Sequence, residues 1–267
     1  MLEYVSCNLC GGNDTLKLPA YYIFQGQRLD LVKCRQCSLV YINPRPDAGM
    51  LKKLYSLNYF EKDWDCGCSG KTYLQAREKL IAMYKANTLA YLKKIGKAGR
   101  ILDLGCAGGH FLVAAREEGW EPWGIEICVE MAAIAAVQPG LRIFTLEMVD
   151  CPLPAHFFTV VQMGDVLEHM MDPLGTLREV WRVLKSGGLL VVHAPVSYAR
   201  LKPEDQAGLI KELPYHIYEF HVPTLKAMLE KAGFLIVEKI VDWLPGTPPE
   251  ERSKSSIERM SFYACKQ

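Results

Sequence analysis

Two C-x-x-C pairs near the start of the chain have the spacing of zinc ligands. Cys7 and Cys10 form the pair in CNLC, and Cys34 and Cys37 form the pair in CRQC. A two-residue spacer lets both thiolates of one turn reach the same ion, and two such turns complete a tetrahedral shell. Four thiolates leave no open position for a catalytic water, so the pattern predicts a structural zinc ion. Four metal-free thiols are the alternative.

A glycine-rich turn is the second candidate for chemistry. In ILDLGCAGGHFL the apolar run contains Asp103. Gly105 and Gly109 come after this run, and a stretch of helical character follows directly. Glycine lets a ligand approach the main chain closely, and a helix start offers unpaired N–H groups. Glu126 ends the next apolar run, where a carboxylate can accept hydrogen bonds from both hydroxyls of a ribose. The alternative for Glu126 is a solvated carboxylate at a strand end.

Two nucleotide ligands compete for this turn, a dinucleotide and S-adenosylmethionine. A dinucleotide fingerprint has the pattern G-x-G-x-x-G, but Ala107 occupies the position of its second glycine. A negative charge at Asp103 would repel a pyrophosphate and attract an ammonium group. The amino-acid end of S-adenosylmethionine carries such a group, so the residues favour S-adenosylmethionine.

Alternating strands and helices must position these residues. From residue 100 onward the pattern predicts an α/β fold, a doubly wound, Rossmann-like parallel sheet with helices on both faces. The seven strands are expected at residues 100–105, 121–127, 142–146, 159–164, 188–195, 234–242 and 260–266. Asp172 is expected to cap a helix over residues 173–185 that ends at Gly187. Another helix is expected over residues 72–95.

The predicted domains are a zinc-ribbon module (1–45), a helical linker and pocket cap (46–98), and a cofactor-binding domain (99–267). Half of the 267 residues are hydrophobic and 23% are charged, which is typical of a globular protein. The net charge of +1 indicates neither a nucleic-acid nor a membrane partner. No apolar run approaches the ~18 residues of a membrane span and no targeting motif appears, so we expect a cytoplasmic protein without a membrane partner. Oligomeric state cannot be read from the sequence.

The remaining cysteines carry weaker signals. Cys66 and Cys68, in DCGCSG, are interpreted as loop cysteines, with a second metal or a redox pair as alternatives. The other four stand in or beside apolar segments, where free cysteine behaves as a small hydrophobe. These are Cys106, Cys128, Cys151 and Cys265.

The motifs DLGCAGGHFL, GIEI, GDVLEHMMDP and LREVWRVLKSGG follow one another in an order that resembles the class I S-adenosylmethionine-dependent methyltransferases. In that class the glycine turn lies beside the methionine part, the acid after the second strand binds the ribose, and the next residue packs on adenine. The backbone at the end of the fourth strand meets the ammonium. The resemblance implies cofactor contacts at Asp103, Gly105, Cys106, Gly109, Glu126, Ile127, Glu147, Met163 and Gly164, with Asp150 as an alternative to Glu147.

The front of the chain is similar to bacterial methyltransferases with an N-terminal zinc ribbon, a group that includes nucleotide-sugar C-methyltransferases. This resemblance implies a small-molecule acceptor and a histidine base. His216 follows a lid-like segment, residues 200–213, and matches the acceptor-side histidine of that group. His169, just after the fourth strand, is the second candidate. Other residues could line the acceptor pocket or touch the cofactor: Tyr215, Tyr218, Glu219, His221 and His110.

The sequence therefore predicts methyl transfer to an O or C nucleophile of a small molecule, such as a sugar nucleotide. One rival is an RNA methyltransferase whose ribbon grips nucleic acid. Residues 1–45 contain five basic and three acidic side chains, an excess too small for strong phosphate binding. The other rival is a protein that binds the cofactor without turnover, against which the intact cofactor motifs argue.

Overall fold

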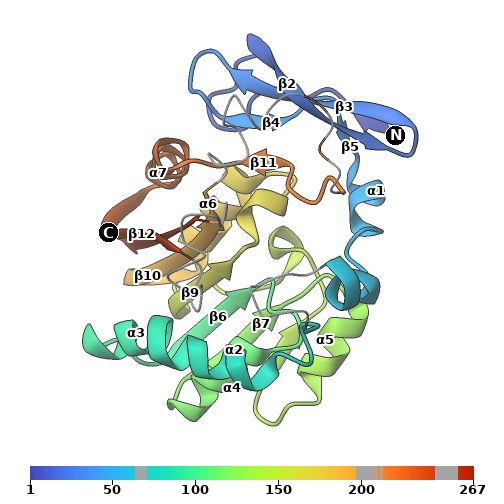
Figure 1. Ribbon diagram of the computed structural model, residues 1–267. Helices are drawn as coiled ribbons and strands as arrows, with labels where there is room; N and C mark the ends of the chain where they lie inside the picture. Colours follow the sequence, from blue (N-terminus) through green and yellow to red (C-terminus); the bar gives the residue numbers. More distant parts are fainter. Residues whose placement is uncertain (64–70, 197–207, 209, 211–212, 244–257) are drawn as a thin grey trace.

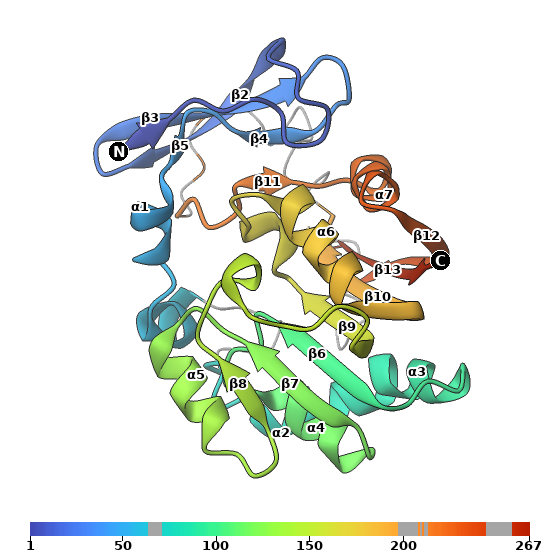
Figure 2. The same cartoon turned by 180° about the vertical axis from the view of Figure 1, so that it is seen from behind.

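The computed structural model describes residues 1–63, 71–196, 208, 210, 213–243 and 258–267. A seven-stranded sheet forms the centre of the molecule (Figures 1 and 2). Its strands are β6 (Arg100–Leu104), β7 (Glu121–Ile125), β8 (Arg142–Phe144), β9 (Phe158–Gly164), β10 (Leu184–Pro195), β12 (Phe234–Trp243) and β13 (Glu258–Lys266). All seven predicted strands are confirmed, with ends that differ by a few residues.

The order across the sheet is β8-β7-β6-β9-β10-β13-β12. Neighbours from β8 to β10 are parallel, whereas β13 runs antiparallel to both β10 and β12. The expectation of an all-parallel sheet was wrong at this one strand. Strand β13 follows β12 in the chain and pairs with it directly, and consecutive strands that are neighbours in a sheet pair antiparallel without a crossover segment. The order reverses between β6 and β9, where α/β sheets bind ligands.

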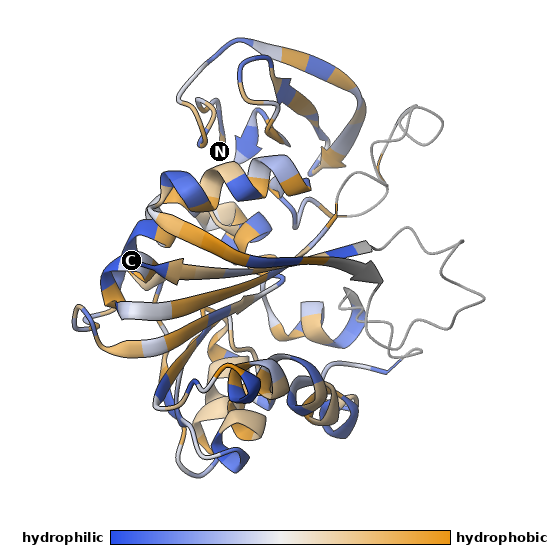
Figure 3. Ribbon diagram, turned by 90° about the vertical axis from the view of Figure 1, so that its left-hand side faces the viewer, coloured by the Kyte–Doolittle hydropathy of each residue, from blue (hydrophilic) through white to orange (hydrophobic). Residues whose placement is uncertain are grey.

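Helices cover both faces of the sheet (Figure 3). Alternation along the strands divides the apolar side chains between two clusters: Ile101, Val160 and Val191 belong to one, and Leu102, Val161 and Val192 to the other. The first cluster includes side chains from α2 (Arg77–Tyr84), a π-helical turn (Lys85–Leu89), α3 (Ala90–Lys94) and α4 (His110–Glu117). The second includes α6 (Pro173–Val183) and α7 (Val222–Lys231). Helix α5 (Val129–Ala136) packs beside β8.

Two helix predictions need correction at their ends. The helix expected over residues 72–95 is helical from Arg77 to Lys94 and contains the π turn. Helix α6 is capped by Asp172 as predicted, with the Gly175 N–H donating to Oδ1 at 2.9 Å. It ends at Val183 and not at Gly187, because Leu184 is extended, fully buried and paired with Phe158 as the first residue of β10.

The N-terminal part forms its own small sheets. Strands β2 (Thr15–Phe24), β3 (Gln27–Cys34) and β4 (Val40–Ile42) are antiparallel, and β1 (Leu2–Glu3) pairs with β5 (Arg45–Pro46). Strands β2, β3 and β4 belong to a four-stranded sheet. Its remaining strand is β11 (Tyr218–Glu219), which lies much later in the chain and pairs with β4. Helix α1 (Ala48–Lys52) and a π turn (Tyr59–Asp63) lead to the main sheet. The three-domain division stays a prediction.

Candidate cofactor and acceptor site

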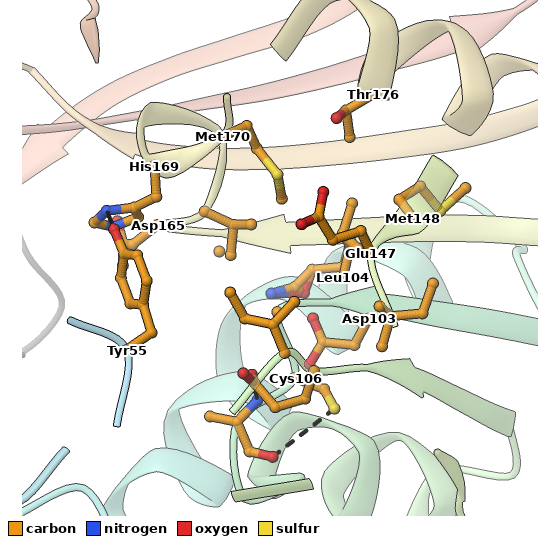
Figure 4. Close-up of a pocket in the computed structure, with 18 of the residues that line it drawn as sticks. Tyr55, Asp103, Leu104, Cys106, Glu147, Met148, Asp165, His169, Met170 and Thr176 are labelled. Carbon is orange, nitrogen blue, oxygen red and sulfur yellow. Dashed lines mark hydrogen bonds between the residues drawn. The ribbon is translucent and has the colours of Figure 1, made fainter. Parts of the chain in front are cut away.

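A cavity lies at the carboxyl ends of β6, β7 and β9, next to the point where the strand order reverses (Figure 4). Most of the predicted cofactor-binding residues line it: Asp103, Gly105, Cys106, Glu126, Ile127, Glu147 and Gly164. Gly109 and Met163 do not. Gly109 starts α4 in a left-handed conformation, and the Met163 side chain is fully buried in the core. Asp150 also lies outside the lining, so the geometry favours Glu147 at that position.

The glycine turn has a conformation that few other residues adopt. Gly105 has a φ of +75°, and a Cβ atom there would lie 2.5 Å from Val166 Cγ2. The N–H groups of Gly105 and Cys106 both donate to the Ile125 carbonyl, at 2.8 and 3.0 Å. The turn is therefore fixed to the end of β7 while its opposite side faces the cavity.

Glu126 holds the turn as well as facing the cavity. Its Oε2 accepts the Ala107 N–H and its Oε1 accepts the Cys128 N–H, both at 2.8 Å. The residue is 5% exposed, so it is not the solvated carboxylate considered as the alternative. Burial raises the pKa of Glu126, although these N–H donors oppose the shift. Each oxygen keeps lone-pair capacity for a ribose hydroxyl.

Asp103 is the second buried carboxyl group of the cavity. It is 4% exposed, and burial together with the charge of Glu126 raises its pKa well above the usual range. Two carboxyl groups in one buried cavity favour a ligand with a positive charge, because a cation would offset the repulsion between them. An ammonium or sulfonium group meets this requirement.

The part of the cavity where the sequence predicts the acceptor is aromatic. Tyr55, Tyr59 and His169 line it, and Figure 4 shows Tyr55 beside His169. The hydroxyl of Tyr55 lies 2.8 Å from His169 Nδ1 and donates to the Tyr215 carbonyl at 2.8 Å. His169 Nδ1 also lies 2.8 Å from that carbonyl, which can only accept, so the pairing favours a proton on Nδ1 and a lone pair on Nε2.

The two candidate bases are neighbours. The rings of His169 and His216 meet edge to face with centroids 4.7 Å apart. Glu168, 1% exposed, has Oε1 3.9 Å from His169 Nε2. The Ile217 N–H donates to the Glu168 carbonyl at 2.9 Å, which ties the two segments together. His169 lines the cavity and His216 does not.

Several other sequence predictions can now be placed. Tyr218 and Glu219 are buried in β11, and the His221 side chain takes part in the capping box that begins α7. None of these lines the cavity. His110 is buried and stacks on Tyr73, with ring centroids 4.2 Å apart. Cys66, Cys68 and nearly all of segment 200–213 lie outside the described residues.

Sequence reasoning missed some residues of the cavity wall. Asp165 follows β9, has a φ of +53° and forms an ion pair with Arg259; both line the cavity. Asp165 stood in a motif already noted, and its position after a strand was the available signal. Arg259 is about a hundred residues away in the chain, so only tertiary structure could join it to the site.

The four N-terminal cysteines come together as predicted. Cys7 Sγ lies 3.4 Å from Cys37 Sγ, and Cys10 Sγ lies 3.4 Å from Cys34 Sγ. All four sulfur atoms are within 4.8 Å of one another. Tetrahedral Zn–S bonds of about 2.3 Å separate thiolates by about 3.8 Å, so the cluster has the donor set and size of a closed zinc site.

Comparisons with known proteins agree with this geometry. A methyltransferase-domain family model matches residues 75–239, so the chain belongs to this family, as a class I S-adenosylmethionine-dependent methyltransferase. A ubiquinone biosynthesis O-methyltransferase from Xanthomonas campestris is 28% identical over 62% of this chain and 74% of its own length. A tRNA U34 carboxymethyltransferase from Desulforapulum autotrophicum is 28% identical over 61% of this chain and 52% of its own.

A solved S-adenosylmethionine-dependent methyltransferase from Mesorhizobium loti has the same fold, with a TM-score of 0.54 and 22% identity over 66% of this chain and 96% of that one. Membership of this family shows that the chain is an enzyme that uses S-adenosylmethionine. The relatives differ in what they modify, so they leave the acceptor open. Among the described residues, no helix has the length and apolar character needed to cross a bilayer.

Proposed function

We propose that the chain transfers a methyl group from S-adenosylmethionine to a hydroxyl or an acidic carbon of a small molecule. The continuous cavity carries the proposal, because it joins the two buried carboxyl groups at one end to Tyr55 and His169 at the other. Glu126 would hold the ribose, Asp103 the ammonium, Ile127 the adenine face and Glu147 the adenine amino group. The zinc ion would be structural, held by the four cysteines.

We propose His169 as the base. Methyl transfer forms a bond from the acceptor to the methyl carbon and breaks the carbon–sulfur bond, releasing S-adenosylhomocysteine. The acceptor proton would pass to Nε2 of His169, which has the lone pair when Nδ1 donates to the Tyr215 carbonyl. The Glu168 carboxylate, 3.9 Å from Nε2, would stabilise the imidazolium that forms. The His216 ring packs edge to face with the His169 ring and would help to hold it in place.

A small acceptor is favoured over RNA on two observations. The acceptor end is aromatic, because the Tyr55 ring packs edge to face on His169 and the Tyr215 ring packs against both Tyr55 and Tyr59. The N-terminal part has no strong positive charge, whereas RNA binding depends on neutralising phosphates. The O-methyltransferase relative supports a hydroxyl acceptor, and the zinc-ribbon resemblance supports a sugar nucleotide.

The proposal is tested with S-adenosylmethionine that carries a deuterated methyl group. The protein is incubated separately with a small-molecule extract and with total RNA from bacterial cells, and products are analysed by mass spectrometry. A labelled small molecule supports the proposal. Label that appears only in RNA would establish the tRNA-modifying alternative, and bound cofactor without labelled product in either pool would contradict turnover.

A further inference from the structure

The first cysteine knuckle contacts the helix that follows the proposed base. Asn8, between Cys7 and Cys10, donates from Nδ2 to Asp172 Oδ1 at 2.7 Å. Its Oδ1 accepts the Leu174 N–H at 3.0 Å. Leu174 is the second residue of α6, and its N–H has no partner within the helix, as in any first turn. The knuckle therefore completes the cap of α6 from a different part of the chain.

A second contact holds the residues just before α6. Arg45, which is 9% exposed, donates from Nη1 to the Met171 carbonyl at 2.7 Å and to the Tyr218 hydroxyl at 3.1 Å. Its Nε donates to Glu3 Oε1 at 2.8 Å. On the other side of the knuckle, Lys231 Nζ donates to the Leu9 carbonyl at 2.6 Å. The N-terminal part is thus hydrogen-bonded to the start of α6, to the residue Met171 just before it, and to the end of α7.

The segment held in this way forms a wall of the cavity. Met170 and Met171 follow His169 directly, and both line the cavity together with Thr176 of α6. No hydrogen bond between described residues joins Asn8 or Arg45 to Asp103, Gly105 or Glu126. The hydrogen bonds of Asn8 and Arg45 therefore reach residues 171–174 and not the glycine turn or Glu126.

We propose that Asn8 and Arg45 are positioning residues, through which the cysteine knuckles fix residues 169–176 against the acceptor. This inference rests on the proposed function, since it concerns the wall next to the proposed base. Zinc bound by Cys7 and Cys10 would fix the turn that carries Asn8, so metal binding would set the shape of the acceptor end and leave the cofactor end unchanged.

The test exchanges the roles of two side chains in the full-length protein. Asn8→Asp removes the donor to Asp172 and places two carboxylates together, while Asp172→Asn alone keeps an acceptor for Asn8. The double variant restores one donor and one acceptor with their positions exchanged. Hydrogen exchange of residues 168–177, S-adenosylhomocysteine affinity by calorimetry, and zinc content are measured for each. Asn13→Ala, an exposed position in the same part, is the control.

We expect Asn8→Asp to speed exchange in residues 168–177 by about 10-fold, the equivalent of one hydrogen bond. The double variant should return it toward the wild-type rate, and the cofactor affinity and zinc content should stay the same. Unchanged exchange in Asn8→Asp, or faster exchange that the double variant does not reverse, would overturn the inference. None of the three measurements needs the acceptor, so the result is independent of whether methyl transfer is found.

Discussion

The imidazole rings of His169 and His216 meet edge to face, 4.7 Å between centroids, although the residues are far apart in the chain. They form one cluster with Glu168. One ring nitrogen of each histidine and one carboxylate oxygen of Glu168 all lie within 4.8 Å of one another. From the sequence alone, the two histidines are alternative candidates for the base. The structure makes them neighbours with different access, since His169 alone of the two lines the cavity.

This arrangement predicts unequal effects of two matched substitutions. His169→Gln should lower turnover by about 100-fold, because the acceptor proton loses its base. His216→Gln should lower it much less, and neither should change the affinity for S-adenosylhomocysteine. Single-turnover rates with the acceptor found by methyl labelling measure the first effect, and calorimetry with S-adenosylhomocysteine measures the second. A larger loss in His216→Gln than in His169→Gln would return the role of base to His216.

Glu126→Gln should weaken cofactor binding by about 10- to 100-fold, equivalent to one or two charge-assisted hydrogen bonds. The amide keeps one acceptor oxygen, so one of the two N–H donors, Ala107 or Cys128, loses its partner. Calorimetry with S-adenosylhomocysteine measures the effect. Glu121→Gln, at a partly buried strand position that pairs with Arg100 and Arg142, is the control and should bind as the wild type does. Equal affinities for all three proteins would remove Glu126 from the site.

Local patterns were sufficient for much of the fold. The apolar runs that became β6, β7 and β9 and the Asp172 cap of α6 depend on neighbouring residues, so the sequence predicts them well. The antiparallel direction of β13 depends on its pairing with β10 and β12, which hydrophobic periodicity does not indicate. The end of α6 is another case, because the pairing of Leu184 with Phe158 overrides the helical pattern.

The candidate site shows the same limit. The cofactor end follows from one turn and the acid after the next strand, which stand close together in the sequence. The acceptor end joins Tyr55, His169, Tyr215 and Arg259 from four distant segments. The contact of η4 (Leu167–His169) with the β11 region brings His169 and Tyr215 together, and Tyr55 and Arg259 join them through tertiary contacts of their own. Sequence spacing cannot report such a contact.

Gly105→Ala should abolish cofactor binding, because a Cβ atom would lie 2.5 Å from Val166 Cγ2 at the wall of the cavity. Gly119→Ala is the matched control, since Gly119 has a similar φ of +85° with nothing within 4 Å of an added Cβ. Both variants carry the left-handed strain of roughly 1–2 kcal/mol. Thermal unfolding and calorimetry should show two destabilised proteins, of which only Gly119→Ala binds S-adenosylhomocysteine. Normal binding by Gly105→Ala would show that the turn tolerates a side chain.

One zinc ion per chain is expected in the purified protein, and Cys34→Ser should lose it. A serine hydroxyl replaces a thiolate poorly in a closed shell, and loss of the metal should destabilise the N-terminal part. Cys265→Ser is the control, because this partly exposed thiol lies outside the cluster. Elemental analysis and thermal unfolding measure the two effects. Full metal content in Cys34→Ser would contradict the assignment of this ligand.

His110 makes stability depend on pH in a direction that the structure fixes. The residue is 1% exposed and its Nδ1 has no hydrogen-bond partner among the described residues. Burial, and then the charge of Arg77, lowers the pKa of His110 from 6.5 to about 4. As pH falls from 6.5 to about 4, the unfolded chain binds a proton that the folded chain excludes, so the folded state loses stability in this window.

His110→Phe should remove this part of the pH dependence. Phenylalanine keeps the ring that stacks on Tyr73 and has no titrating nitrogen. Between about pH 7 and about pH 4.5 the wild type should lose roughly 2 to 3 kcal/mol more free energy of unfolding than the variant does. Other titrating groups, among them His193 with a pKa lowered by burial to about 4, are the same in both proteins and cancel. Urea unfolding without cofactor at the two pH values measures the difference. Equal losses in the two proteins would mean that His110 binds its proton equally well in the folded state.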